Sequence, residues 1–512
     1  MDEHAERVRK IAAAVKGFHE TKQKFRIDHG STNSTRNQRS KGNNVINTSK
    51  MNHVLTVDTD KRTILVEPNV PMDRLVEATL AHDLIPLVIM DFPGITAGGG
   101  YAGTACESSS FKHGFFSDTV NSIEMVLANG EVVICSKDER KDLFRGSAGA
   151  MGSFGVLTLL EIQLEPAKKY VETTYHPVTS FDEAVKMCHD VSTGTSSYDY
   201  VDAILFSSTS GAVVTGRCTN DRPVDLPVQR FSASTDPWFY SHVRDRLCTS
   251  QEPVTELIPL PEYLFRYDRG GFWAGESIFQ GQKGGEGIIP NTKTYKSWLD
   301  PLLHTRMLYA AVHSGGFNGQ IVQDMTVPYD KAPGFLEWVA KEMEVWPLWL
   351  CPVKPSPNPT VHPHKNPVKS NGPQPQMLNI GIWGAPTESE FDYWIDINRQ
   401  LEAKLREVGG MKWMYGVNLE NDEDFWGQHD KEWYDQLRKK YHADWLPSIA
   451  DKARTTPKKC LEAAETQPWM DHILFNYFPG FVITALVRAW WSGAWKHDRA
   501  ATWPKWVPRE TK

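Results

Sequence analysis

The spacing of apolar positions predicts short helices and strands in mixed order over the first third of the chain. Apolar stripes at helical spacing predict an opening helix over residues 5–18 and a second helix after Pro71. Apolar residues on both sides of Asn129-Gly130 are the strongest hairpin signal, because Asn-Gly is a favoured two-residue turn. Further strands are expected at 53–58 and 62–67, as a hairpin, and at 156–164. Because strands and helices do not alternate strictly, the pattern favours an α+β domain over a doubly wound one.

After about residue 167 the sequence predicts longer helices, a proline-rich loop and a strongly apolar C-terminal stretch. Ser180-Phe-Asp-Glu183 predicts the start of one helix, and Thr387-Glu-Ser-Glu390 predicts the start of a longer one that Gly409-Gly410 ends. The proline-rich stretch 354–376 is expected to be an exposed loop. The most apolar stretch, 473–491, contains proline and polar residues that suit buried packing better than a membrane span, and it leaves an interfacial or oligomer-forming element open.

Composition narrows the functional classes. A chain of 512 residues is long enough for at least two domains, and its 40% hydrophobic and 23% charged residues are typical of a globular protein. The net charge of −7 argues against a nucleic-acid-binding protein. The 7 cysteines form no CxxC pair, so neither a disulfide framework nor a zinc site is expected. The N-terminal residues do not resemble a signal peptide, which predicts a reducing, cytoplasmic location.

A glycine-rich run carries the main chemical signal. Gly98-Gly-Gly-Tyr-Ala-Gly103 matches the dinucleotide pattern GxGxxG, which requires a helix directly after it. The following segment, 104–114, is rich in serine and is predicted to be non-helical, which argues against a Rossmann site. The run from Pro93 to Thr104 has no side chain at Gly94, Gly98, Gly99, Gly100 and Gly103, so we expect its N–H groups to converge on an anion in a nest without a helix. Together with the glycine and hydroxyl groups of 25–34, this run predicts two loops that hold a diphosphate.

Several sequence blocks resemble a known family. The run PGITAGGGYAGTACESSSFKHG, followed by NSIEMVLANG, DLFRG and GSFGV, resembles FAD-binding domains of the vanillyl-alcohol-oxidase (PCMH) type. It is more similar still to the delta-24 sterol reductase (Diminuto/Dwarf) family. The downstream blocks QDMTVP, VWPLWLCP, IGIWG, MYGVN and DFW extend this resemblance over about residues 25–450.

The resemblance implies how the chain divides. It predicts an α+β protein with a PCMH-type FAD-binding domain over 1–168. A substrate or cap domain, with an antiparallel sheet covered by helices, is expected over 169–410 and contains the proline-rich loop. Residues 411–512 are expected to complete the FAD domain and to end in the apolar tail.

The resemblance also implies site residues. The residues implied to bind FAD are Gly30, Ser31, Thr32, Asn33, Ser34, Pro93, Gly94, Ile95, Thr96, Gly98, Gly99, Gly103, Thr104, Glu107, Ser108, Ser109, His113, Gly114 and Val156. Asn33 stands where some relatives attach flavin through histidine, so non-covalent FAD is predicted. The catalytic candidates are Tyr415, Asn418 and His113. Asp324 is a weaker candidate, because carboxylates in such loops more often cap N–H groups.

The implied activity is that of an FAD-dependent oxidoreductase. It would reduce a carbon–carbon double bond, in a sterol side chain or a similar apolar alkene, with NADPH as a transient electron donor. Two alternatives remain open: an FAD-dependent oxidase of an alcohol or carbohydrate that uses oxygen, and a non-catalytic lipid-binding protein. The predicted partner is a small sterol-like molecule and not nucleic acid. An oligomer is left open, as is peripheral contact with the endoplasmic reticulum membrane through the apolar tail, since the family's N-terminal anchor has no counterpart in this sequence.

Overall fold

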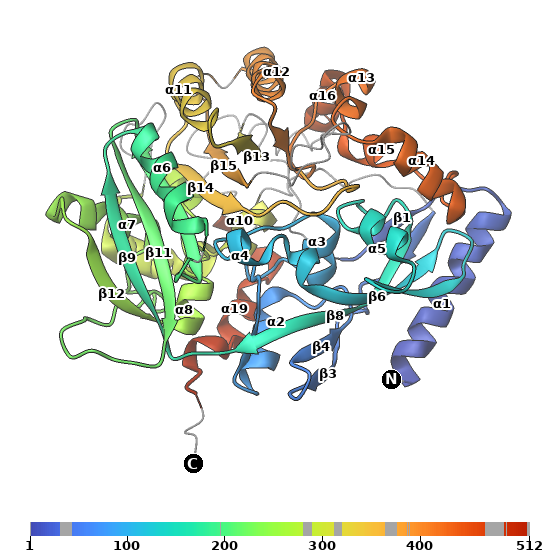
Figure 1. Cartoon of the computed structure of the whole chain (residues 1–512), viewed down its shortest axis with the longest axis horizontal. Coiled ribbons are helices and arrows are strands. Elements are labelled where there is room, and N and C mark those ends of the chain that lie inside the picture. Colours follow the sequence, from blue (N-terminus) through green and yellow to red (C-terminus); the bar gives the residue numbers. More distant parts are fainter. Residues whose placement is uncertain are drawn as a thin grey trace.

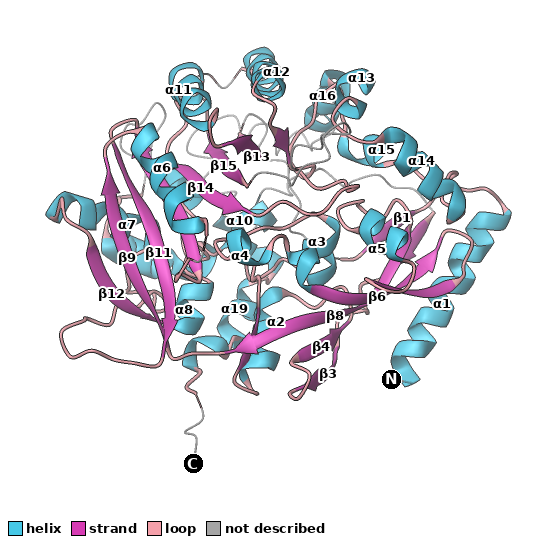
Figure 2. Cartoon of the chain, viewed as in Figure 1, coloured by secondary structure: helices cyan, strands magenta, loops and turns pink. Residues whose placement is uncertain are grey.

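Two large antiparallel sheets organise the protein (Figure 1). The structure is a computed structural model that describes residues 2–30, 44–194, 196–279, 289–311, 320–363, 376–386, 388, 390–465, 486–487 and 489–508. Strands pair with antiparallel neighbours in both sheets, and helices lie against the sheet faces (Figure 2). This arrangement confirms the predicted α+β class.

The first sheet is built from the first third of the chain. Its strand order is β3-β4-β8-β6-β7, and β5 pairs with the end of β8. The strands are β3 (Val54–Asp58), β4 (Thr63–Val66), β5 (Leu84–Pro86), β6 (Val120–Leu127), β7 (Val132–Ser136) and β8 (Gly155–Pro166). Both predicted hairpins, β3–β4 and β6–β7, are confirmed. Gly130 has a φ of +88°, which explains why the second hairpin turn needs glycine.

Helices and a short parallel strand pair surround this sheet. The small pair consists of β1 (Arg26–Asp28) and β2 (Val45–Asn47), and the opening helix α1 contacts both β2 and β6. The helices are α1 (Asp2–Glu20), α2 (Met72–Leu80), α3 (Ala97–Ala102), α4 (Ser110–His113) and α5 (Lys141–Ser147). The predicted helices over 5–18 and after Pro71 therefore correspond to α1 and α2.

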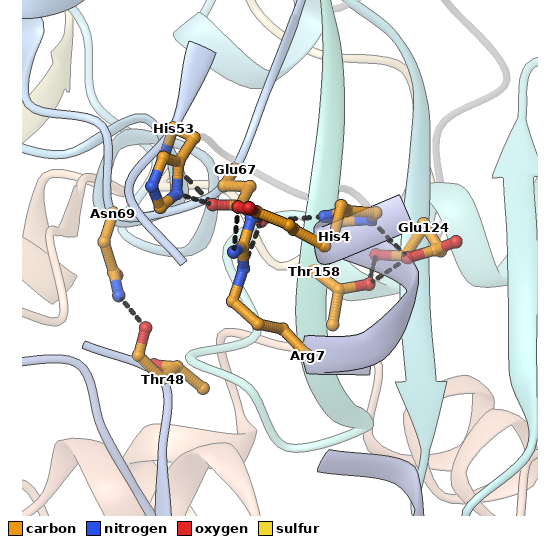
Figure 3. A network of polar contacts seen from close by, with 9 residues as sticks. His4, Arg7, Thr48, His53, Glu67, Asn69, Glu124 and Thr158 are labelled. Carbon is orange, nitrogen blue, oxygen red and sulfur yellow. Dashed lines mark hydrogen bonds and ion pairs between the residues drawn. The ribbon is translucent and has the colours of Figure 1, made fainter. Parts of the chain in front are cut away.

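A buried carboxylate fastens α1 to the first sheet (Figure 3). Glu67 accepts hydrogen bonds from Arg7 at 2.9 Å and is paired with His4 at 2.8 Å and His53 at 2.7 Å. The second ring nitrogen of His4 lies 3.2 Å from Glu124 of β6. Burial alone would raise the pKa of Glu67, but these partners bring it below its ordinary value.

We expect Glu67→Gln to lower the free energy of unfolding by about 3 kcal/mol, because the substitution removes the buried carboxylate that pairs with Arg7 and bonds to the rings of His4 and His53. Urea titration at pH 7 measures this loss. Since the pKa of Glu67 is lowered in the folded protein, its contribution is present above the unfolded pKa and is lost on acidification. The difference between the two proteins should therefore be constant above about pH 4.5 and shrink as the pH falls below it, whereas a difference that does not depend on pH would contradict this account.

The second sheet uses residues 170–412. Its order is β12-β9-β11-β10-β14-β15-β13-β16, so chain neighbours are interleaved with segments far apart in sequence. The strands are β9 (Tyr170–Val178), β10 (Tyr200–Ser207), β11 (Ser210–Thr219), β12 (Val254–Pro259), β13 (Ile321–Pro328), β14 (Leu348–Val353), β15 (Met377–Gly384) and β16 (Met411–Lys412). Helix α4 contacts β14, so the serine-rich segment of the first unit packs directly on this sheet.

Helices cover the second sheet. The outer helices α6, α11 and α12 contact one another or β10 and β13, while α7 and α8 contact β9, β11 and β12 (Figure 1). The bounds of these helices and of α9 and α10 are α6 (Phe181–Ser192), α7 (Phe239–Thr249), α8 (Leu260–Leu264), α9 (Lys293–Leu299), α10 (Thr305–Ala311), α11 (Ala332–Glu342) and α12 (Phe391–Glu407). The side chain of Ser180 caps α6 as predicted. The predicted start at Thr387 is wrong: α12 begins at Phe391 after Glu390, without a side-chain cap, and Thr387 itself lies outside the described residues.

Two of the C-terminal helices, α14 and α15, return to the first unit. The C-terminal helices are α13 (Asp422–Trp426), α14 (Lys431–Lys440), α15 (Ile449–Ala453), α16 (Pro457–Glu465) and α19 (Trp495–Ala500). Asp142 of α5 pairs with Lys440 at 2.5 Å and accepts the Tyr441 hydroxyl at 2.8 Å, which fixes α14 against α5.

Two sequence segments fall largely outside the described structure. Residues 354–363 form a loop as predicted, but Ser356 and residues 360–363 are buried because Ser356 and His362 bond to Asp118 and Ser117, which corrects the prediction of exposure. Residues 364–375 of the proline-rich stretch are not described. Most of the apolar stretch 473–491 is likewise undescribed, so membrane contact through it stays a prediction. Among the residues that the structure describes, no helix combines the length and apolarity that crossing a bilayer requires.

Candidate active site at the glycine run

The glycine run forms a short helix, which corrects the prediction of a nest without a helix. Residues Ala97–Ala102 are α3, and the Thr96 hydroxyl accepts the Gly99 N–H at 3.1 Å. The Gly98 N–H donates to the Pro68 carbonyl at 2.7 Å, and the Gly100 N–H donates to the Thr96 carbonyl at 2.8 Å. These amides are therefore engaged by protein acceptors. The 104–114 segment was expected to be non-helical, yet Ser110–His113 form one helical turn, α4.

A pocket opens where the end of α3 meets the second sheet. Its lining comes from four segments of the chain, which are far apart in sequence. The lining residues are Ala102, Gly103, Thr104, Gly149, Met151, Val361, Pro363, Lys412, Met414 and Tyr415. Thr104 and Met151 have φ values of +55° and +51°, conformations that non-glycine residues rarely adopt and that cluster at functional sites.

A hydrogen bond across the two units fixes the pocket wall. The Trp413 indole N–H donates to the Thr104 carbonyl at 2.7 Å, and the Trp413 backbone N–H donates to the Asp324 carbonyl at 3.0 Å. Trp413 thus ties the strained residue after α3 to β13 of the second sheet. The next two residues, Met414 and Tyr415, are held over the pocket as a consequence.

Tyr415 is paired with a buried carboxylate. Its hydroxyl donates to Asp324, which also accepts the Asn379 amide at 3.0 Å and the Trp383 indole N–H at 3.2 Å. Gly381 lies opposite Asp324 on β15, and a Cβ there would lie 3.1 Å from the carboxylate and 2.7 Å from the Trp383 ring. The IGIWG block therefore leaves the space that this carboxylate and this ring occupy.

Burial shifts both members of the pair toward their protonated forms. It raises the pKa of Asp324 to about 6, against the lowering effect of the hydrogen bonds from Tyr415, Asn379 and Trp383. Burial and the Asp324 charge raise the pKa of Tyr415 well above its ordinary value. Tyr415 therefore keeps its proton at neutral pH, whereas Asp324 exchanges a proton near neutrality. Asp324 is connected to the pocket through its hydrogen bond with Tyr415. A carboxyl group with a raised pKa in such a position is suited to proton transfer.

An aromatic wall extends from this pair. The Trp383 ring lies 4.5 Å from Phe272 and 5.7 Å from Trp349, measured between ring centroids. Phe92 lies 5.5 Å from Phe272 and 5.8 Å from Tyr309. Trp383 and Tyr309 are only half-buried. The wall therefore places a packed aromatic cluster, with Trp383 and Tyr309 partly accessible, beside the Asp324–Tyr415 pair.

The serine-rich segment joins a buried ion network. Arg266 pairs with Asp91 at 3.2 Å and Asp202 at 2.8 Å, and it donates to the Ser108 hydroxyl at 3.2 Å. The Asp91 N–H donates to Glu107, whose pKa burial and Asp91 raise well above its usual value. Glu107 and Ser108, both predicted to bind FAD, thus hold the first unit to Arg266 and β10.

The structure separates two catalytic candidates from Tyr415. Neither His113 nor Asn418 lines the pocket that Tyr415 lines. Burial and neighbouring Lys112 lower the pKa of His113 to about 4, so its ring is neutral at pH 7 and is a poor proton donor. The Asn418 side chain accepts the Glu420 N–H at 3.1 Å and shapes a turn.

The predicted FAD residues are distributed around the same region. Gly103 and Thr104 line the pocket, Gly30 follows β1 with a φ of +71°, and Val156 is buried in β8. The Pro93 carbonyl accepts the Asp73 N–H at 3.2 Å. Residues 31–34 lie outside the described structure, so their predicted roles stay predictions. The other predicted contacts at Gly94, Ile95, Ser109 and Gly114 belong to the segments before α3 and around α4.

The chain's own residues fit FAD. Gly149 has a φ of +76°, and a Cβ there would lie 2.5 Å from Thr104, while one at Gly103 would lie 2.9 Å from the Gly99 carbonyl. Glycine at these two positions therefore lets Thr104 and the Gly99 carbonyl pack closely at the edge of the pocket. Met414 and Tyr415 line the same pocket, where they would offer an apolar surface and a hydroxyl group to a bound flavin.

Sequence reasoning underrated Asp324 and overlooked Trp383. Both stand in blocks that carried the family resemblance, QDMTVP and IGIWG, but spacing alone cannot show that β13 and β15 are neighbours. Lys452 was also overlooked. Its ammonium donates to the carbonyls of Met151 and Gly152 at 2.9 and 3.0 Å.

Comparisons with known proteins identify the family to which the chain is similar. Residues 4–136 match the family model described as FAD binding domain. The chain is 31% identical over 412 residues to Delta(24)-sterol reductase of Homo sapiens, covering 78% of this chain and 75% of that protein. It is 29% identical over 452 residues to Delta(24)-sterol reductase of Arabidopsis thaliana, covering 82% and 79%. Similarity to Cytokinin dehydrogenase 4 of Oryza sativa subsp. japonica is 30% over 163 residues, covering 32% of this chain and 30% of that protein.

Proposed function

The chain belongs to the delta(24)-sterol reductase family of FAD-dependent oxidoreductases, and from this premise we propose that it reduces a carbon–carbon double bond in a sterol-like substrate. We propose NADPH as the electron donor. The observation that carries the proposal is the Asp324–Tyr415 pair, set between the glycine run and the aromatic wall.

Reduction of an unactivated alkene requires a hydride and a proton on adjacent carbons. Bound FAD supplies the hydride chemistry in its reduced form. Tyr415 lines the pocket and keeps its proton, so it is placed to protonate the second carbon. Protonated Asp324 then returns a proton to the Tyr415 oxygen, so the O–H bond broken on tyrosine is remade and the charge ends on the carboxylate. A tyrosinate beside a carboxylate is thereby avoided.

The protein environment favours this proton transfer. The Asn379 amide and the Trp383 indole donate to Asp324, and they stabilise the carboxylate that remains after the proton has left. The aromatic wall of Trp383, Phe272 and Tyr309 lies beside this pair, and it would keep water away from an alkene bound there. These features favour an apolar substrate over a carbohydrate, whose hydroxyl groups would need polar partners.

Anaerobic mixing of the purified flavoprotein with NADPH tests the direction of electron flow. We expect NADPH to bleach the flavin absorbance and a sterol with a side-chain double bond to restore it. The same sterol with a saturated side chain is the matched control and should not restore the colour. Bleaching by an alcohol or a sugar, with peroxide formed in air, would instead establish the oxidase alternative. A protein that cannot be loaded with FAD would indicate the lipid-binding alternative.

A further inference from the structure

A second cavity lies where α5, α14 and the segment after β14 meet. Helices α5 and α14 pack side by side (Figure 1). The cavity has a volume of about 340 Å³, which is within the range of small-ligand sites. Its lining residues are Lys141, Asp142, Arg145, Pro359 and Trp433. None of the described residues that the sequence predicts to bind FAD is among them, so this cavity is distinct from the pocket at the glycine run.

Close packing of the two helices places Trp433 at the cavity. A Cβ on Gly146 would overlap Leu437 and lie 3.6 Å from the Trp433 ring, so glycine lets α14 approach α5. The Asp430 carboxylate caps α14 by accepting the Trp433 N–H at 2.9 Å. The Trp433 side chain is only half-buried. Part of a large aromatic surface is therefore open to a ligand in the cavity.

The cavity carries a surplus of positive charge. The charge of Asp142 is already compensated, because Lys440 pairs with it at 2.5 Å. Within the described parts of the chain, no carboxylate lies within ion-pair distance of Lys141 or Arg145. Arg145 donates to the Asn358 carbonyl at 3.3 Å, and Lys141 is exposed. Two cations are thus left to meet an anionic ligand.

This cavity lies next to the pocket that Tyr415 lines. Pro359 lines the cavity and Val361 lines the pocket, so the Cα atoms of these two residues are at most about 7 Å apart. On α5 and the turn after it, Arg145 lines the cavity and Gly149 lines the pocket. A Cβ on Gly149 would lie 3.2 Å from the Val361 side chain, so both segments meet at the pocket. A ligand longer than this separation can occupy the cavity with one end and reach the pocket with the other.

The residue types indicate an aromatic ligand that carries a phosphate group. Adenine is flat and stacks on aromatic rings, whereas phosphate oxygens accept charge-assisted hydrogen bonds from arginine and lysine. NADPH combines both features, because a phosphate is attached to the 2′-oxygen of its adenosine. Its nicotinamide stands at the opposite end of the molecule, as a ligand that spans the cavity and the pocket requires.

We propose that the cavity binds the adenosine 2′-phosphate end of NADPH, with Trp433 against the adenine and with Lys141 and Arg145 on the 2′-phosphate. The proposal rests on the electron donor proposed above, and it names the site that recognises this donor. It also gives the proline-rich segment a function, because Pro359 belongs to the nucleotide cavity and Val361 to the adjacent pocket.

Calorimetric titration of the FAD-loaded protein with NADP⁺ and with NAD⁺ tests this site without any reaction. The two dinucleotides differ only in the 2′-phosphate, and neither of them can reduce the flavin. We expect Arg145→Gln to weaken NADP⁺ binding by about 10- to 100-fold and to leave NAD⁺ binding within about twofold. Lys141→Gln, at an exposed position, should weaken NADP⁺ binding by about tenfold. Arg145→Lys should keep much of the affinity for NADP⁺, because lysine also binds phosphate.

Substitutions of Trp433 test the adenine contact. Trp433→Leu should weaken the binding of both dinucleotides by about tenfold, because the stacking surface is lost. Trp433→Phe should keep most of the affinity, because it retains an aromatic ring. Equal affinities of the Leu and Phe variants would contradict the proposed contact.

Arg140→Gln is the matched control for charge. Arg140 stands at the N-terminal end of α5 and pairs with Glu139, but it does not line the cavity. This variant should bind NADP⁺ like the unmodified protein. Equal weakening by Arg140→Gln and Arg145→Gln would show diffuse surface charge instead of a contact, and would overturn the site.

The remaining outcomes separate the site from the proposed reaction. If Arg145→Gln binds NADP⁺ as the unmodified protein does while NADPH still bleaches the flavin, the site is wrong and the donor stands. Displacement of NADP⁺ from the apoprotein by FAD would assign the cavity to FAD and overturn the proposal. If the affinities respond as expected but NADPH fails to bleach the flavin, the nucleotide site stands and only the donor role is wrong.

Discussion

Tyr415→Phe should slow reduction of the sterol double bond by about 100- to 10,000-fold, the range over which a positioned acid accelerates proton transfer. The substitution removes the hydroxyl group that lines the pocket and donates to Asp324, while it keeps the ring and its packing. Flavin reduction by NADPH needs no proton from this residue. Its rate should therefore stay within about twofold of the original.

Stopped-flow mixing separates the two half-reactions. The first mix follows bleaching of the flavin by NADPH, and the second follows reoxidation by the sterol. Tyr393→Phe is a matched control, because the Tyr393 hydroxyl donates to the Glu342 carbonyl at 3.4 Å, next to the outer helices. Equal slowing of both half-reactions by Tyr415→Phe would place Tyr415 in flavin positioning instead of proton donation.

Asp324→Asn should change the shape of the pH profile as well as the rate. The protonated carboxyl is the active form in the proposed relay, and burial raises its pKa to about 6. The sterol half-reaction should therefore be fastest below pH 6 and should slow by about tenfold per pH unit well above it. Asparagine can still bond to Tyr415 but cannot supply a proton, so a slow rate without this pH dependence is expected.

A second carboxyl group with a raised pKa serves as the control. Burial raises the pKa of Glu165, at the end of β8, to about 7, but this residue does not line the pocket. Glu165→Gln should leave the pH profile of the sterol half-reaction unchanged. If the fall in rate above pH 6 persists in Asp324→Asn, another group supplies the proton.

Local sequence signals predicted the elements whose structure depends on near neighbours. The Asn129-Gly130 hairpin, the Ser180 cap and the helix over 5–18 follow from turn chemistry, capping and apolar periodicity. The glycine run was harder to predict. Glycine disfavours helices in isolation, yet packing of Gly98 on Pro68 and the Thr96 cap make α3 helical.

The candidate site was only partly predictable, because its members meet through long-range strand pairing. Tyr415 was found from its motif, but Asp324 gained its importance only when β13 and β15 placed Asn379 and Trp383 around it. Nothing in the spacing of residues specifies the order of an eight-stranded sheet whose neighbours are far apart in sequence. The burial that raises the pKa of Asp324 is likewise a property of the assembled fold.

The ion pair between Asp142 of α5 and Lys440 of α14 has a consequence for folding during synthesis. Asp142 and Lys440 are 298 residues apart, and the turn before β8 receives Lys452 from even further along the chain. A ribosome that has finished the first sheet must still synthesise most of the remaining polypeptide before these helices emerge. Until then the pocket lacks the residues that the later part of the chain supplies, such as Met414 and Tyr415. We therefore expect FAD to bind late, after translation is complete.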